Sequence, residues 1–508
     1  MSAKGRLVLF ALAAAPATLW TLGSVAVGMP VGVTIVFVLA LGLTFVGGAW
    51  LGHDWSRPVT VPAVLRCVLA GLCLSLILRT FCFSAYRIPS GGMEPTLLGA
   101  ATPEHLRRCA LPERHVSPGG DRIVVANHAY LFNEVGRFDV AVFRFPLDTP
   151  RIFVQRVVGL PDEEFMVWRG NIFARRDAGE FRLQRKSPQT QDSIWIEPPD
   201  EDLATQWTAQ PPCRAVEGRL RTGTGESCFR FSGMLRDDGG RPVGDALVAF
   251  EVTAEEGSRV RAAVENEMGR FELVIEAGGS RIEYARGGDR RTHPLPGAKL
   301  RAGRAAPGRF MVYDGQAVLI LDGKTHPAFE AVTFLDRELS SPRSVIEFGS
   351  TGPATFAKLR IGRDIYYKCE DPDHGGGENL QDGVPLRIGP GQYVMMGDNV
   401  GNSHDSRKWK RLTFRLKDGR RVICDSQAWR THDEDAIREA MVRFGLSRRP
   451  DHYVRADVNG REWVFSDEDL DPARREPDRE PFPFVRRGHI TGKASWIWWP
   501  PARARTIR

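Results

Sequence analysis

The first part of the chain contains three apolar stretches, at residues 7–27, 31–50 and 61–83. Each is close to the roughly 20 residues that an α-helix needs to cross the hydrocarbon core of a bilayer. A cleavable leader has one short apolar segment followed by a cleavage site, so three in succession indicate permanent insertion. We therefore expect residues 1–83 to form three transmembrane helices.

The charges beside these stretches predict the orientation of the chain. Lys4 and Arg6 precede the first stretch, and Arg57 lies between the second and the third. Positive residues favour the cytoplasmic side, which places the N-terminus and the second loop there. With an odd number of spans, everything after residue 83 is expected outside the cytoplasm, with membrane lipid as one partner.

The pattern after residue 83 is typical of β-structure. Short alternating runs at 122–126, 139–145 and 165–168 are separated by Gly, Pro and Asp. The runs at 242–250 and 269–275 are expected to pair in a small β-sandwich. The run 317–324 contains Asp322-Gly323, which predicts a hairpin turn. The expected fold class is mainly β.

Charge and cysteine content exclude several functions. A net charge of +7 over 508 residues is modest, and it accompanies no nucleic-acid-binding motif, so no nucleic-acid partner is predicted. The sequence has no CxxC or HExxH spacing, so no metal and no cofactor is predicted. Beyond the apolar stretches the cysteines are odd in number, and the candidate disulfide pair Cys213 and Cys228 is not decided by spacing.

Five short segments, in order, resemble the conserved boxes of bacterial type I signal peptidases, the Ser/Lys proteases of the S26 family. Residues 87–97 read Arg-Ile-Pro-Ser-Gly-Gly-Met-Glu-Pro-Thr-Leu, and Arg-Val-Val-Gly-Leu-Pro follows Gln155. The others are 138–143, the Gly-Asp-Asn-Val-Gly-Asn-Ser-His-Asp-Ser-Arg run at 397–407, and Gly-Lys-Ala at 492–494. The resemblance covers less than half of the chain, in pieces, and implies the β catalytic core of that family.

Both residues of the catalytic dyad are replaced at the matching positions. The resemblance places the nucleophilic serine directly before Met93, where this chain has Gly92, and the general-base lysine at Gln155. Glycine has no hydroxyl, and a carboxamide does not accept a proton at neutral pH. Neither residue can perform the dyad's chemistry.

The remaining site positions are retained. The resemblance implies that Ser90 is an oxyanion-hole donor, that Ser403 orients the lysine, and that Asp405 pairs with Arg407, with Met93 and Pro95 as supporting residues of the first box. Two positions depart from the family pattern besides the dyad. Phe138 stands in a glycine position, and Asp162-Glu163 replaces Gly-Asp, so an altered turn is expected there.

The boxes divide the chain into six segments. A helix is predicted at 431–445, where Thr431 and Glu434 fit a capping box, and 467–480 is predicted to be an exposed linker. The segments are three transmembrane helices (1–83), core, first part (84–173), β-rich insertion (174–361), core, second part (362–407), second insertion (408–487), and closing core strand with tail (488–508).

Two functions fit these observations. The first is an inactive homologue in the bacterial inner membrane that keeps the signal-peptide groove and binds signal peptides or exported precursors, or an active signal peptidase paralogue. The alternative is an active protease in which Ser90 attacks and Lys408 or Lys410 is the base. Residues two apart on an extended strand lie about 6.6 Å apart, which opposes a shift of the nucleophile to Ser90. Trp496, Trp498 and Trp499 are candidates either for contact with the bilayer or for core packing.

Overall fold

The computed structural model describes most of the chain after residue 81. The described residues are 82–103, 106, 114–197, 207–210, 214–216, 219–231, 235–237, 240–276, 279–334, 343–369, 379–426 and 452–508. The predicted transmembrane segment lies outside them except for its last two residues, and the predicted helix at 431–445 lies outside as well. Among the described residues, no helix has the length and apolar character needed to span a bilayer.

The core is an antiparallel sheet built from both ends of the described chain. β31 lies between β2 and β3, so a strand near the C-terminus joins two strands from the first part. Alternate side chains of these strands fill two apolar clusters, and the mainly β fold class is confirmed. In order, the strands are β1 (Phe83–Arg87), β2 (Arg122–Ala126), β31 (Ile490–Trp499), β3 (Val140–Phe145), β4 (Asp148–Gly159), β24 (Gln392–Met396) and β30 (Val485–Arg486), with β32 (Arg505–Thr506) beside β31.

A smaller sheet and four short helices complete the core. Ser187 accepts a hydrogen bond from the backbone N–H of Thr190, and Pro188 occupies the first turn, so α6 has a regular N-terminus. The strands are β23 (Leu386–Arg387), β5 (Glu164–Trp168), β6 (Asn171–Arg175) and β7 (Arg182–Leu183), and the helices are α5 (Ala129–Phe132), α6 (Pro188–Asp192), η4 (Arg487–His489) and η5 (Pro501–Arg503).

The first insertion is a β-sandwich of two antiparallel sheets that pack on a shared apolar core. One sheet contains β19 (Lys324–Thr325), β18 (Gln316–Leu321), β17 (Ala306–Tyr313), β12 (Ala246–Ala254), β22 (Ala354–Arg363), β10 (Arg219–Thr222) and β9 (Arg214–Val216), with β20 (Phe329–Glu330) beside β18. The other contains β16 (Asp289–Leu295), β15 (Ser280–Arg286), β14 (Gly269–Ile275), β13 (Val260–Asn266), β21 (Val345–Ser350), β11 (Ser227–Phe231) and β8 (Trp207–Gln210).

One predicted pairing in the sandwich is wrong and one turn is confirmed. The runs 242–250 and 269–275 do form strands, but β12 pairs with β17 and β22, whereas β14 pairs with β13 and β15 in the opposite sheet. The chain crosses between the sheets after β12, which alternation along a strand does not reveal. Asp322 and Gly323 connect β18 to β19 with φ of 49° and 74°, as the hairpin prediction requires.

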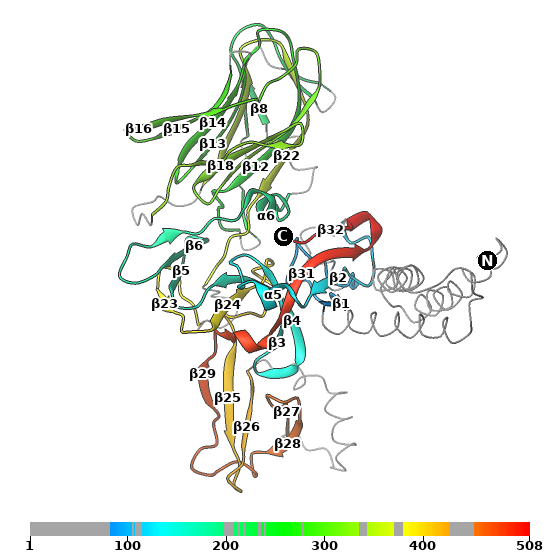
Figure 1. Cartoon of the computed structure of the whole chain (residues 1–508), viewed down its shortest axis with the longest axis vertical. Coiled ribbons are helices and arrows are strands. Elements are labelled where there is room, and N and C mark those ends of the chain that lie inside the picture. Colours follow the sequence, from blue (N-terminus) through cyan, green and yellow to red (C-terminus); the bar gives the residue numbers. More distant parts are fainter. Residues whose placement is uncertain are drawn as a thin grey trace, which may run out of the picture.

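The second insertion forms two small sheets around its own apolar cluster. They contain β26 (Arg421–Asp425), β25 (Lys410–Arg415) and β29 (Asp478–Pro481), and the hairpin of β27 (His452–Ala456) with β28 (Glu462–Ser466). The linker predicted at 467–480 is therefore wrong at its end, because β29 pairs with β25. Figure 1 shows these strands at one end of the long axis, the sandwich at the other end, and the core between them.

The sandwich joins the core through two adjacent segments. The incoming chain at Ile196 and the outgoing chain at Arg363 exchange both backbone hydrogen bonds, at 3.0 and 2.8 Å. We call this pair of segments the stalk. The stalk places the sandwich beside α6 (Figure 1).

Candidate functional site

The first box lies in turns directly after β1. Residues 90–97 form bends and turns, and the backbone N–H of Leu97 donates to the carbonyl of Met93 at 2.9 Å. The extended strand assumed for Ser90 in the sequence analysis is therefore wrong, and the spacing of about 6.6 Å does not apply. Ser90 is exposed to solvent. Its oxyanion-hole role stays a prediction.

Gly92 lies against the fourth box. Its carbonyl accepts a hydrogen bond from the backbone N–H of Asn399 at 3.1 Å. A Cβ atom built on Gly92 would lie 3.8 Å from the Oγ of Ser403, an ordinary contact, and its φ is not in the left-handed region. Neither backbone geometry nor space requires glycine here, so the missing hydroxyl is not explained by the fold.

Gln155 lies on β4 opposite Ala141 of β3. Its side chain is buried, and its Nε2 donates to the carbonyl of His404 at 2.8 Å. Its Oε1 is buried and has no hydrogen-bond partner in the described part of the chain. Because Gly92 contacts Ser403 and Gln155 contacts His404, the two replaced positions border neighbouring residues of one box.

A buried ion pair stabilises this box from within. Arg407 donates from Nε and Nη2 to the carboxylate of Asp405, at 2.8 and 2.6 Å, as the resemblance implies. Its other contacts are the carbonyls of Lys368 and Val400, both at 2.9 Å. Burial raises the pKa of Asp405, but the charge and hydrogen bonds of Arg407 outweigh burial, and the net shift is downward.

A second buried pair, not foreseen from the sequence, connects four boxes. Arg156 is fully buried and donates from Nε and Nη2 to Asp398, at 2.8 and 2.6 Å. Its Nη1 reaches the carbonyl of Phe138 at 2.7 Å, and Thr96 donates to Asp398. The sequence does show an arginine directly after the replaced base position. It does not show that this arginine pairs with Asp398, which lies far away in the chain.

The two residues that replace a glycine of the family pattern both have a left-handed backbone conformation. Phe138 has φ of 68° and Asp162 has φ of 61°. Glycine is the residue that adopts this conformation without steric cost, which explains its use in the family pattern. Asp tolerates the left-handed region better than Phe does. Glu163 then accepts the Leu160 backbone N–H at 2.9 Å, so the predicted turn is present with different side chains.

His404 is a further, partly buried group beside the site. Its Nε2 lies 2.9 Å from Oδ2 of Asp425, at the end of β26 in the second insertion. The ring packs edge-on against Phe145, Phe153 and Trp409. The second insertion therefore contacts the candidate site, which sequence order did not indicate.

The alternative bases lie at the start of the second insertion. Lys410 begins β25, and its carbonyl accepts a hydrogen bond from Ser426 at 2.9 Å. Lys408 follows the Arg407–Asp405 pair, and its backbone N–H donates to the carbonyl of Asp405 at 2.8 Å. A direct role for either lysine stays a prediction.

Comparisons with known proteins agree with the boxes. A family model described as signal peptidase, peptidase S26, matches residues 61–191. The chain is 26% identical over 114 residues to a Probable signal peptidase I-2 of Synechocystis, a match that spans 21% of this chain and 43% of that relative.

Solved structures overlap only loosely with about a third of this chain. The carbohydrate recognition domain of Emp46p in its potassium-bound form overlaps 31% of this chain and 88% of that domain, with 8% identity and a TM-score of 0.24. Carbohydrate binding module CBM66 from Bacillus subtilis overlaps 31% of this chain and 95% of the module, with 11% identity and a TM-score of 0.22. Overlaps this loose assign no ligand to the sandwich.

The family match ends within α6. It covers the first box at 87–97, the replaced base position Gln155 and the strands between them. The box at 397–407 lies beyond the match, and the fold brings it beside the replaced positions through Ser403 and His404. The core of this chain, over residues 61–191, is therefore similar to the signal peptidase I family.

Proposed function

We propose that this chain is a non-catalytic signal peptidase homologue that binds the signal peptides of exported precursors without cleaving them. The observation that supports this most directly is that Gly92 and Gln155 border neighbouring residues of one box, Ser403 and His404. The resemblance places the dyad at these two positions, which carry neither a hydroxyl nor an amine. Amide hydrolysis by this family's chemistry needs both groups.

The side-chain environment of Gln155 supports the same conclusion. A lysine base must be neutral near pH 7, which burial promotes by disfavouring the charged form. Gln155 is buried as such a lysine would be, but its amide is held by the carbonyl of His404 and cannot accept a proton. The site therefore retains the position of a base without its function.

An open sheet edge supports peptide binding. Within the described sheet, β1 pairs on one side only, with β2. An extended peptide can add to such an edge by backbone hydrogen bonds, with pockets selecting alternate side chains. β1 ends at Arg87 and leads into the Gly92 turn, so a strand added along it would approach the replaced dyad.

Membrane attachment is part of the proposal. β1 begins where the third apolar stretch ends, at Phe83. Trp496 and Trp499 on β31 are 46% and 39% exposed, which favours a surface role over core packing for these two rings. Tryptophan is enriched at membrane interfaces, so this surface fits contact with lipid headgroups. With the predicted spans, it fits a location at the outer face of the bacterial inner membrane.

The alternative function is an active signal peptidase with a displaced nucleophile. It is favoured by the exposure of Ser90 in a turn rather than on a strand, which leaves its hydroxyl accessible. Incubation of the full-length, detergent-purified protein with a labelled precursor tests it. We expect no cleavage. Cleavage that disappears in Ser90→Ala would overturn the proposed function in favour of this alternative.

A gain-of-function experiment tests the groove itself. Gly92→Ser with Gln155→Lys restores the two missing groups, and the 3.8 Å clearance at Gly92 accommodates the new side chain. We expect measurable cleavage of the precursor by this double variant. The matched control, Gly92→Ala with Gln155→Lys, has the same added Cβ and amine but no hydroxyl, and should stay inactive.

Peptide binding is measured separately on the wild-type protein. A fluorescent signal peptide should bind, and a peptide with large residues in place of the small ones before the cleavage point should bind more weakly. Equal binding of both peptides, or none of either, together with an inactive double variant, would contradict a retained groove.

A further inference from the structure

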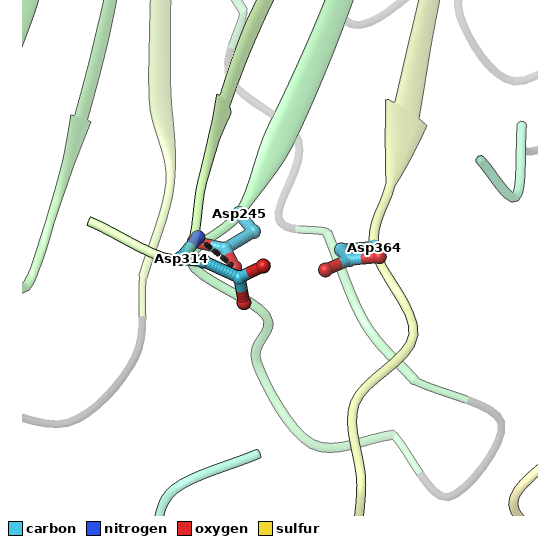
Figure 2. A group of neighbouring side chains, drawn as sticks. All are labelled: Asp245, Asp314 and Asp364. Atoms are coloured by element: carbon cyan, nitrogen blue, oxygen red, sulfur yellow. Dashed lines mark hydrogen bonds between the residues drawn. The ribbon is translucent and has the colours of Figure 1, made fainter. Parts of the chain in front are cut away.

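Four charged residues meet at the base of the sandwich, outside the site described above. Lys186 lies between β7 and α6, on the core side of the stalk, and Asp245 directly precedes β12. Asp314 lies in the turn between β17 and β18, and Asp364 directly follows β22. We call these residues the junction cluster. Figure 2 shows that the three carboxyl groups, from separate segments, point toward a common centre.

Lys186 is the cation of the cluster. Its Nζ lies 3.1 and 2.9 Å from the two carboxylate oxygens of Asp314 and 3.0 Å from Oδ2 of Asp364. Its backbone N–H also donates to Asp314, at 3.2 Å. All three side chains are at most 4% exposed. The ammonium group therefore contacts two buried carboxylates at once.

Asp245 provides a carboxyl group without a counter-ion. Its Oδ2 accepts the backbone N–H of Asp314 at 3.1 Å, the bond drawn in Figure 2. Its Oδ1 is buried and has no hydrogen-bond partner among the residues that the structure describes. Carboxylate oxygens of Asp245, Asp314 and Asp364 lie within 4.8 Å of one another. Burial, and then the charges of Asp314 and Asp364, raise the pKa of Asp245 well above 3.8, which favours its protonated form.

We propose that the junction cluster is a self-modifying site in which Lys186 and Asp314 condense to an intramolecular amide bond. The amine is the nucleophile, and the Cγ atom of Asp314 is the electrophile. Asp364 is the base at 3.0 Å from the amine, and Asp245, with a carboxylate oxygen within 4.8 Å of one on Asp314, is the acid. Each of the four side chains has one role, and no external reagent is needed.

The reaction is balanced within the cluster. Asp364 first takes a proton from the Lys186 ammonium group, and the free amine attacks Cγ of Asp314. Asp245 donates its proton to the departing carboxyl oxygen, the C–N bond forms and the C–O bond breaks. The nitrogen then loses a second proton, which restores Asp245, and the proton on Asp364 completes the water. One water leaves with its oxygen from Asp314, and the ammonium group has lost two protons in total, one through Asp364 and one that restores Asp245.

Proximity and burial favour this condensation. The nucleophile is already in contact with the carboxyl group it attacks, which removes most of the entropic barrier to a reaction between two groups. Burying an ion pair costs desolvation free energy that the ion pair only partly recovers. An amide has no net charge, so its formation removes that cost. The ring of Phe138, 5.7 Å from Nζ, and buried Tyr313 help to exclude the water that hydrolysis would require.

The resting protonation state defines the first step. Burial lowers the pKa of Lys186, but Asp314 and Asp364 raise it more, so the amine is charged before reaction. Proton transfer to Asp364 must therefore precede attack. This bond would form whether or not the site at Gly92 binds peptides, so the two proposals fail independently.

Peptide mass spectrometry of the purified full-length protein tests the proposal. Trypsin cleaves after a free Lys186 but not after one whose amine is in an amide bond. We expect the peptide 186–214 joined to the peptide 310–324, lighter than their sum by one water, with fragment ions that place the bond between Lys186 and Asp314. Complete cleavage after Lys186 and a free peptide 310–324 would overturn the proposal, as would a bond to Asp364 in place of Asp314.

Conservative variants separate the chemistry from folding. Lys186→Arg keeps a cation in the cluster but cannot form this amide, so its peptide 310–324 should be free. Asp245→Asn keeps the size of the side chain but removes the acid, so the joined peptide should fall at least tenfold at equal incubation time. Circular dichroism checks that both variants are folded. An unchanged yield of joined peptide in folded Asp245→Asn would contradict the assigned role of Asp245.

Discussion

The core and the base of the sandwich bury charge in opposite ways. In the core ion pairs, Arg156–Asp398 and Arg407–Asp405, each carboxylate has its own guanidinium with two hydrogen bonds. In the junction cluster, one ammonium group contacts the carboxyl groups of Asp314 and Asp364, and the carboxyl group of Asp245 lies beside them. A balanced ion pair stabilises the structure, whereas a cluster with more carboxyl groups than cations favours a proton on one carboxyl group.

The largest expected effect is the loss of one cation from a core ion pair. Arg156→Met leaves the buried carboxylate of Asp398 without its partner and should lower the free energy of unfolding by about 3–5 kcal/mol. Denaturant unfolding of the detergent-solubilised protein measures this. The double change Arg156→Met with Asp398→Leu should recover much of the loss, because no buried charge remains unpaired.

An exposed pair provides the matched control for Arg156. Arg420 and Asp418 form an ion pair at 2.6 Å in a solvent-exposed turn. Arg420→Met should leave the unfolding midpoint unchanged within error. If Arg156→Met and Arg420→Met had the same effect, burial would not distinguish the core ion pairs from surface pairs.

The next effect is an opposite pH dependence of two buried aspartates. The pKa of Asp405 is lowered in the folded state, so its contribution to stability is present above its ordinary value of 3.8 and is lost as the pH falls through the lower folded pKa. Asp405→Asn should therefore cost about 2–3 kcal/mol at neutral pH and progressively less in acid. Unfolding curves between acidic and neutral pH measure this.

Asp245 should show the reverse sign. Its folded pKa is raised, so its contribution is complete below 3.8 and is lost as the pH rises through the folded pKa. Asp245→Asn should match the parent near pH 4 and become the more stable of the two as the pH rises. Comparison in a Lys186→Arg background keeps the cluster in its ionic form. A stability difference of the same sign for both aspartates would show that the junction cluster behaves like a core ion pair.

The smallest effect is expected on the outer face of the sandwich. Arg270 contacts Glu272 and Glu347, at 3.2 and 2.8 Å, on a partly exposed surface. Arg270→Met should cost at most about 1 kcal/mol, and the cost should vanish in roughly 1 M salt, where the Debye length is about 3 Å. The effect of Arg156→Met should depend little on salt. Equal salt sensitivity at both positions would contradict the contrast between exposed and buried charge.

Contacts within a single box could be predicted from the sequence because the residues of a box interact locally. Asp405 and Arg407 lie two positions apart, and their side chains pair directly. Ser90 was misplaced because its neighbours form turns after β1, a conformation that alternation of apolar residues does not encode. The glycine positions of the family pattern predicted backbone conformation rather than side-chain contacts. Phe138 and Asp162 keep the left-handed backbone without the glycine that the family uses there.

The junction cluster was not predictable because its residues are distant in the sequence. The sequence gives no sign that these residues are neighbours. Only the packing of the sandwich on the stalk brings together Lys186, Asp245, Asp314 and Asp364. The strand pairing failed for the same reason. β12 and β14 read correctly as strands, but the choice of sheet depends on contacts that a single alternating run does not contain.

The stalk makes the sandwich a separable insertion in the core. Because Ile196 and Arg363 meet as hydrogen-bonded neighbours, everything between them replaces what could be a single reverse turn of a hairpin. A gene rearrangement could add or delete this whole lobe and require only a short new connection. Related chains could carry a different lobe at this one insertion point.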